Sequence, residues 1–136
     1  MHVHGKCHCG AITLTAEVDP KKALLCHCTD CQVLSGSAYR TLVPARADGF
    51  KILSGKPKSY VKTADSGAKR AQVFCPDCGT ALYSIPDEGD PEIYMLRVGM
   101  LAERDALQPR TQIWTHSAQE WSGDLSGVKA FAGQFE

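Results

Sequence analysis

Apolar and polar residues alternate along residues 11–18, where positions 12, 14, 16 and 18 are apolar and threonine or glutamate lies between them. A period of two is typical of a strand with one buried face, so this segment is predicted to be a β-strand that ends at Asp19-Pro20. Short apolar runs predict further strands at residues 23–25, 38–43, 71–74, 81–85, 92–98 and 112–114. No helical period of 3.6 residues is sustained anywhere. The expected fold is therefore all-β, built from antiparallel sheets with little helix.

Turn-forming residues between these segments indicate how the strands connect. Residues 50–53 and 59–63 flank Ser54-Gly55-Lys56-Pro57, which predicts a hairpin between the two segments. Pro44 is expected to end the strand at residues 38–43, because proline cannot donate a backbone hydrogen bond.

Helix is expected only in short pieces. Residues 29–34 are predicted to form one helical turn with Thr29 as its cap, and residues 101–107 a short helix that ends before Pro109. The segment from Ser117 onward has a mixed pattern. Its large apolar residues are expected to pack as a lid on the sheet, and these are Trp121, Leu125, Val128 and Phe131.

The chain of 136 residues has the length and composition of one globular domain, so residues 1–136 are expected to form a single domain. Lys plus Arg and Asp plus Glu number 15 each, so no net charge recruits nucleic acid or an anionic membrane. The sequence holds no apolar run near the roughly 18 residues of a spanning helix. Residues 1–6 show no signal peptide, and a cytoplasmic protein with reduced thiols is expected.

Seven cysteines are the most informative feature of the composition. Four thiolates complete a tetrahedral zinc site, whereas three leave one position open for water or substrate. Cys7-x-Cys9-Gly10 and Cys75-x-x-Cys78-Gly79 resemble each other, since a glycine follows each pair and each adjoins a predicted strand. These two pairs are therefore predicted to share one structural zinc ion, and its ligands are Cys7, Cys9, Cys75 and Cys78.

The remaining cysteines, Cys26, Cys28 and Cys31, lie within six residues and lack the glycine. They are predicted to bind a second, open zinc ion and to form the catalytic site. One alternative is a second structural site closed by a histidine, for which His8, His27 and His116 are candidates. Another is a redox-active or nucleophilic cysteine cluster without metal.

Other polar residues have simpler expected roles. His2 and His4 are expected to be solvated terminal residues, and His116 an exposed or hydrogen-bonded residue at a strand end. Two roles are open to Asp30, which lies inside the triplet: it is expected to cap the loop, and the alternative is that it orients a bound water or thiol.

The order of these motifs resembles the glutathione-dependent formaldehyde-activating enzymes, a family that includes the centromere protein V-like zinc domains. The motifs are Gly5-x-Cys7-x-Cys9-Gly10, then Cys26-His27-Cys28-x-x-Cys31 followed by Ser35-Gly36-Ser37, then Phe74-Cys75-x-x-Cys78-Gly79-Thr80. Residues 98–101 and 112–117 also resemble family segments. The resemblance covers nearly the whole chain.

The resemblance implies a β-tent fold whose antiparallel sheets are held together by zinc. It implies a structural zinc at the four-cysteine group, a catalytic zinc at the triplet, and a carbon–sulfur lyase that joins formaldehyde to glutathione as S-(hydroxymethyl)glutathione. Many relatives have basic residues directly after the triplet, whereas Gln32-Val33 follow Cys31 here.

Two function hypotheses follow. The first is a zinc enzyme acting on a thiol–aldehyde adduct, with glutathione as the small-molecule thiol and with the open zinc only partly occupied. The second is a non-catalytic zinc-containing module that binds proteins. The fourth ligand of the second zinc distinguishes them, because water or an added thiol favours the enzyme and a protein ligand favours the module.

Overall fold

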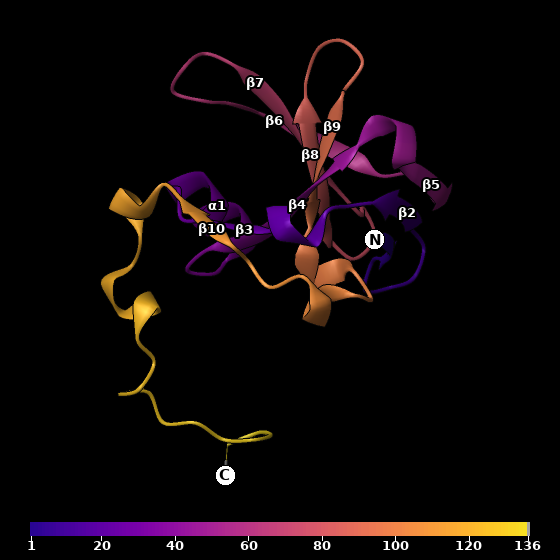
Figure 1. Ribbon diagram of the computed structural model, residues 1–136. Coiled ribbons are helices and arrows are strands. Elements are labelled where there is room, and N and C mark those ends of the chain that lie inside the picture. The colour runs from indigo at the N-terminus through magenta and orange to yellow at the C-terminus, as the bar shows by residue number, and fades with distance from the viewer. Residues whose placement is uncertain (136) are drawn as a thin grey trace.

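Two β-sheets form the frame of the protein, and a computed structural model describes residues 1–135 of it (Figure 1). The smaller sheet has three strands in the order β1-β2-β5. These are β1 (His2–Lys6), β2 (Thr13–Glu17) and β5 (Lys51–Ser54). The larger sheet has seven strands in the order β10-β3-β4-β9-β8-β7-β6. These are β3 (Leu24–Cys26), β4 (Arg40–Arg46), β6 (Lys58–Thr63), β7 (Lys69–Phe74), β8 (Ala81–Pro86), β9 (Ile93–Arg97) and β10 (Thr111–Ile113).

Neighbouring strands are antiparallel at every named pairing except one. The exception is the edge strand β10, which runs parallel to β3 and places Ile113 opposite Cys26. The predicted all-β architecture is confirmed. The parallel pair matters for the site, because it brings the C-terminal part of the chain beside the cysteine triplet.

The alternating pattern of β2 produces the expected burial, since Leu14 and Ala16 point into the core and their neighbours are partly or fully exposed. The core lies where the two sheets meet. Isolated bridges join Val18 to Ala45 and Gly5 to Leu101 across this junction. The largest fully buried side chains are Val3, Cys7, Ile12, Leu14, Val43, Cys75, Leu82, Leu96, Leu101 and Leu107.

Strand β1 was not among the predicted strands, and His2 and His4 belong to it. Both histidines face solvent as expected, but each has a carboxylate partner. The Nδ1 atom of His4 lies 2.6 Å from Glu103, and His2 contacts Glu17. Five residues containing a glycine were too short and too polar to show a strand pattern, and pairing with β2 supplies the missing stabilisation.

The predicted hairpin between residues 50–53 and 59–63 is wrong. Strand β5 pairs with β2 and β6 pairs with β7, so the turn joins two different sheets. The predicted end of a strand at Pro44 is also wrong, because β4 continues to Arg46. Pro44 lies opposite Met95 of β9, and β3 pairs only with residues 40–42 of β4, so the side of β4 that faces β3 is unpaired at Pro44 and can accommodate a residue without an N–H.

Helix α1 (Thr29–Ser35) occupies the predicted segment, but Cys28 rather than Thr29 is its N-cap. The cysteine sulfur accepts a hydrogen bond from the Cys31 N–H at 3.3 Å. The second predicted helix is wrong, because residues 101–107 contain only a short 3-10 turn at Arg104–Ala106. Within residues 1–135, no helix is long and apolar enough to cross a membrane.

The predicted C-terminal lid is also wrong. The side chains of Trp121, Leu125, Val128 and Phe131 are 46 to 59% exposed, and the segment leaves the sheets instead of covering them (Figure 1). Residues 118–135 form no strand and pair with neither sheet, so no backbone hydrogen bonds of a sheet hold these side chains against it.

Gly55, in the turn between β5 and β6, offers a test of the packing between this turn and the start of the chain. Its φ is +83°, and an added Cβ would lie 2.5 Å from the Ala11 carbonyl oxygen. Gly55→Ala is therefore expected to lower the free energy of unfolding by about 2 to 4 kcal/mol, through backbone strain and overpacking. Gly67→Ala is the matched control, since Gly67 has φ +87° but open space around it, and about 1 kcal/mol is expected there. Urea titration measures both, and equal losses would contradict the packing argument.

Candidate metal centres

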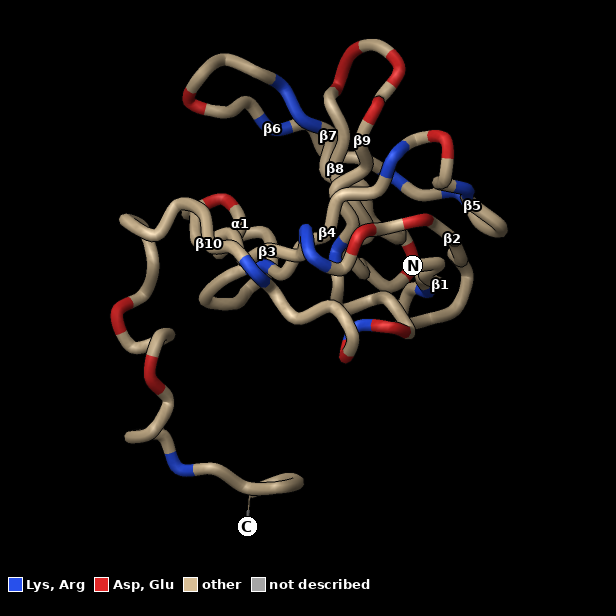
Figure 2. Tube along the Cα trace, in the orientation of Figure 1, with Lys and Arg blue, Asp and Glu red and all other residues tan. Residues whose placement is uncertain are grey.

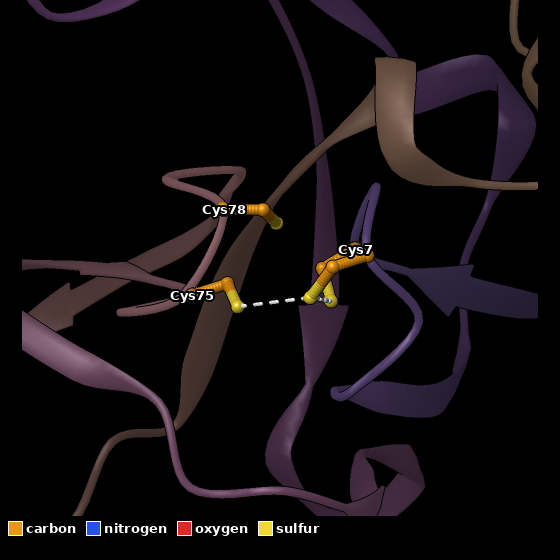
Figure 3. Close-up of side chains that lie close together, drawn as sticks. Cys7, Cys75 and Cys78 are labelled. Atoms are coloured by element: carbon orange, nitrogen blue, oxygen red, sulfur yellow. Dashed lines mark hydrogen bonds between the residues drawn. The ribbon is translucent and has the colours of Figure 1, made fainter.

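The seven cysteines lie in two groups. In one group the sulfur atoms of Cys7, Cys9, Cys75 and Cys78 are all within 4.8 Å of one another. In the other group the same holds for Cys26, Cys28 and Cys31. Figure 3 shows Cys75 and Cys78 on one loop, facing Cys7 on a separate segment of the chain. Both groups have the ligand atoms that a metal ion requires.

The two halves of the four-cysteine group repeat one local structure. The N–H of Cys7 bonds the Ile12 carbonyl, and the Gly10 N–H bonds the Cys7 carbonyl. In the second half, Cys75 bonds Thr80 and Gly79 bonds Cys75 in the same way. Gly10 and Gly79 both have positive φ, at 84° and 78°, which explains why a glycine follows each pair.

The sulfur spacing of this group fits tetrahedral zinc. A zinc–sulfur bond of about 2.3 Å gives sulfur–sulfur separations of about 3.8 Å at tetrahedral angles. The Cys9 sulfur lies 3.6 Å from that of Cys7 and 3.8 Å from that of Cys75. Four sulfur donors at this spacing, two of them buried, are the donor set of a closed structural site.

Hydrogen bonding favours the thiolate form of Cys78, which carries the negative charge that a metal ion binds. The Thr80 hydroxyl lies 3.2 Å from its sulfur and lowers the pKa of Cys78 to about 5. This group therefore includes a thiolate at neutral pH, the form that binds metal.

The three-cysteine group is built where β3 meets α1. Cys26 ends β3, Cys28 is the helix cap, and Cys31 lies in the first turn of the helix. Hydrogen bonding from Cys31 lowers the pKa of Cys26 to about 5, so this group also includes a thiolate. Three sulfurs on so short a segment can bind one ion and leave a tetrahedral position free.

All three sulfur-bearing residues line a pocket of about 600 Å³. The apolar part of its wall comes from several strands and from α1, and includes Leu34, Leu42, Ile93, Met95, Ile113 and Trp114. A volume of this size suits a small organic molecule rather than a macromolecule. The cluster is thus open to a ligand on the side that faces the pocket.

The pocket also contains charged residues of both signs. Its basic residues are Lys62, Arg70 and Arg97, and its acidic residues are Asp30, Asp90 and Glu92. Figure 2 shows the basic residues of β6 and β7 and the acidic residues on the loop that joins β8 to β9. Lys62 pairs with Asp30 at 2.8 Å, so Asp30 forms an ion pair rather than the expected loop cap.

Arg70 and Arg97 have no carboxylate partner among residues 1–135. The Arg97 guanidinium donates to Gln72 Oε1 at 2.6 Å, and that of Arg70 donates to Ser84 Oγ at 3.2 Å. Arg97 is almost fully buried, its Nε has no partner, and burial lowers its pKa to about 9. Both side chains stay positive at neutral pH and can accept an anionic group.

No histidine joins the three-cysteine group in the part of the chain that the structure describes. His27 is buried, its Nε2 lies 2.8 Å from Gln112 Oε1, and its ring meets Tyr39 edge-on at 5.4 Å. His8 is exposed, and its backbone N–H bonds Thr80. His116 lines a smaller neighbouring hollow with Asp30 and Lys62.

Gln32, which directly follows Cys31, has a positioning role. Its amide nitrogen donates to the carbonyls of His27 and Ser117, at 2.8 and 2.9 Å. Its oxygen accepts from Gln119. Gln32 therefore ties the cysteine loop to the segment after β10 and leaves anion binding to other residues.

Sequence reasoning did not select Arg70 or Arg97. Arg70 was grouped with surface charges, and Arg97 was one residue in an apolar strand. The sequence did contain a signal for Arg97, namely a charged residue inside a predicted apolar strand. Charged side chains are seldom buried unless they bind a partner or a ligand, so this position was a candidate site residue.

The model of the family described as "Glutathione-dependent formaldehyde-activating enzyme" matches residues 2–117. The chain belongs to this family. The match includes both cysteine groups and every strand of the two sheets.

Two further proteins are similar to this family member. An uncharacterized lyase of Schizosaccharomyces pombe (strain 972) is 34% identical over 83 residues, which are 58% of the chain and 54% of the lyase. The chain thus spans about half the length of that curated relative. The crystal structure of a Rhodobacter sphaeroides protein superposes with a TM-score of 0.60 at 22% identity, covering 82% of the chain and 99% of the other protein. That likeness supports the fold alone.

Proposed function

We propose that the protein is a zinc-dependent carbon–sulfur lyase that forms S-(hydroxymethyl)glutathione from glutathione and formaldehyde. One observation carries the proposal: a three-sulfur group, one ligand short of a closed zinc site, lines a pocket the size of a small molecule. The family description names this chemistry, and the yeast relative is named a lyase. The proposal treats residues 1–136 as one domain that acts in the cytoplasm, where thiols are reduced.

In this proposal Cys7, Cys9, Cys75 and Cys78 hold a structural zinc, and Cys26, Cys28 and Cys31 hold the second. The second zinc would lower the pKa of a bound thiol and polarise the aldehyde oxygen. Three thiolates give that site a net charge near −1, which weakens Lewis acidity. The residues of the pocket must therefore contribute much of the catalysis by binding and orienting the reactants.

The charged residues of the pocket match the charges of glutathione, which carries two carboxylates and one ammonium group. Arg70 and Arg97 lack carboxylate partners in the described chain and are placed to bind carboxylates of the substrate. Asp90 and Glu92, at the acidic loop, are placed to accept the ammonium group. Binding at both ends fixes the thiol in the middle of the molecule near the cysteine group.

The reaction itself needs no other co-reactant. The thiol sulfur forms a bond to the formaldehyde carbon, the carbonyl double bond becomes a single bond, and the thiol proton ends on the new hydroxyl oxygen. The pocket is open, so this proton can move through solvent. The reverse reaction breaks the same carbon–sulfur bond, which is the lyase direction.

Zinc content with and without glutathione tests the open site. Two zinc ions per chain are expected, of which a chelator removes one quickly, and glutathione slows that removal because its thiol occupies the free position. S-methylglutathione is the matched control, since it keeps every charge but has no thiol, and it should protect weakly. Two equally tight ions indifferent to glutathione would instead favour the protein-binding module.

Turnover is measured separately. Exchange between formaldehyde hydrate and the glutathione adduct, followed by ¹³C NMR, should be faster with the zinc-loaded protein than without it. Exchange at the uncatalysed rate would refute the proposed activity even if glutathione protects the metal.

A further inference from the structure

The C-terminal arm, defined as residues 118–135, is the part of the protein that the proposed function does not use. It has no strand, and its only regular element is a 3-10 turn at Glu120–Gly123. Figure 1 shows it running away from both sheets. The family match ends at residue 117, just before the arm begins.

The arm is too apolar for a solvated tail. It carries five large apolar side chains that are 46 to 72% exposed, namely Trp121, Leu125, Val128, Phe131 and Phe135. Its charged residues are only Glu120, Asp124 and Lys129. A segment that stays solvated is normally poor in aromatic residues and rich in charge. Exposed apolar surface of this extent marks a binding surface.

The arm is held to its own domain only near its start. Gln119 donates to Gln32 Oε1 at 2.8 Å, and Trp121 lines a shallow hollow with Val33 and Gly36. The polar contacts after this point are local, such as Ser126 N–H to Asp124 and Lys129 over the Phe131 ring. The apolar side chains beyond Trp121 are thus available to another surface.

The β1 groove is a second surface without a partner. It is a hollow of about 890 Å³ beside β1, with a mainly apolar lining that includes Leu14, Leu53, Met100 and Ala102. The exposed basic residues of its lining are Lys6 and Arg104, whereas Arg97 is almost fully buried and bonds Gln72. The lining residue His4 pairs with Glu103 at 2.6 Å. Leu53 is 55% exposed at its rim.

We propose that the C-terminal arm of one copy of the protein docks in the β1 groove of a second copy, and that the two copies exchange arms. The apolar side chains beyond Trp121 fill the apolar part of the groove. Asp124, which lies in the docked segment, faces the exposed basic residues Lys6 and Arg104 of the groove. This inference does not depend on the proposed chemistry.

The area available is sufficient for a specific dimer. A fully buried aromatic side chain removes about 150 to 250 Å² from solvent. Beyond Trp121, two exchanged arms contribute four aromatic and four aliphatic side chains, which are 46 to 72% exposed before docking. With the matching groove surface, the buried total exceeds the roughly 1,000 Å² that a biological interface needs. Exchange of arms also doubles each contact by symmetry.

Sedimentation of the zinc-loaded chain of residues 1–136 under reducing conditions tests the proposal. The unaltered chain is expected to be a dimer whose dissociation constant rises at least about 30-fold in the double variant Leu125→Ser/Phe131→Ser, because both anchors are lost. Leu53→Glu in the groove should have the same effect. Tyr60→Glu is the matched control, since Tyr60 is also 55% exposed but lies outside the groove, and it should leave the dimer intact.

Mixing the variants separates arm exchange from other dimers. The arm variant retains its groove and the groove variant retains its arm, so an equimolar mixture should form a heterodimer through one intact contact. A photoreactive phenylalanine at position 131 should then cross-link to the groove of a differently isotope-labelled chain. A monomeric unaltered chain, a dimer indifferent to the arm variant, or cross-links confined to one chain would overturn the proposal.

Discussion

Cys75→Ser is expected to unfold most of the protein, whereas Cys28→Ser is expected to leave it folded with one zinc ion in place of two. Cys75 is fully buried, and its group joins the loop before β2 to the end of β7. Zinc binding at such a group is folding free energy of about 10 kcal/mol, which equals the whole stability of an ordinary domain. Cys28 is partly exposed, and its group joins only residues 26–31, at the junction of β3 and α1.

The two variants control for each other, because each replaces one sulfur atom by oxygen. Circular dichroism reports the fold and atomic absorption reports the metal content. A folded Cys75→Ser protein beside an unfolded Cys28→Ser protein would reverse the assignment of structural and open sites. Proposed turnover should be lost in both variants, so turnover alone would not discriminate.

Arg70→Gln is expected to raise the KM for glutathione about 10- to 100-fold with little change in kcat. The lost binding free energy corresponds to one charge-assisted hydrogen bond between Arg70 and a substrate carboxylate. Arg70 lines the pocket beside the cysteine group and bonds only Ser84 among the described side chains. The substitution keeps a hydrogen-bond donor and removes the charge, so the fold should be unaffected.

Two comparisons make the Arg70 result specific. With 2-mercaptoethanol, a thiol without a carboxylate, Arg70→Gln should turn over as fast as the unaltered protein. Arg110→Gln removes the same charge from an exposed residue outside the pocket, and should leave turnover of both thiols unchanged. Equal losses with both thiols would show that Arg70 acts on the cysteine group or the fold rather than on the carboxylate.

Local sequence signals predicted the parts of the protein that depend on near neighbours. The alternation of residues 11–18 gave β2, and the glycines after Cys9 and Cys78 indicated the two matching turns. The seven cysteines lie in the two groups that their spacing suggested. That these groups bind zinc stays a prediction.

Features that depend on distant residues could not be predicted in this way. Strand β5 pairs with β2 instead of with its neighbour β6, and this choice is set by the core between two sheets. Arg70 and Arg97 meet the cysteine group only because β7 and β9 lie in the same sheet as β3. The prediction of a C-terminal lid failed because apolar composition indicates that side chains favour burial but does not specify which surface buries them.

The two cysteine groups also differ in when they become complete as the chain is synthesised. The three-cysteine group is complete once residue 31 has been added, whereas the four-cysteine group is complete only after Cys78 has been added. Closing the short segment costs little entropy, and closing more than 60 residues between Cys9 and Cys75 costs more. A nascent chain that binds zinc would therefore load the proposed catalytic site first. A cell short of zinc would then leave four thiols of the structural group open to oxidation before the sheets are joined.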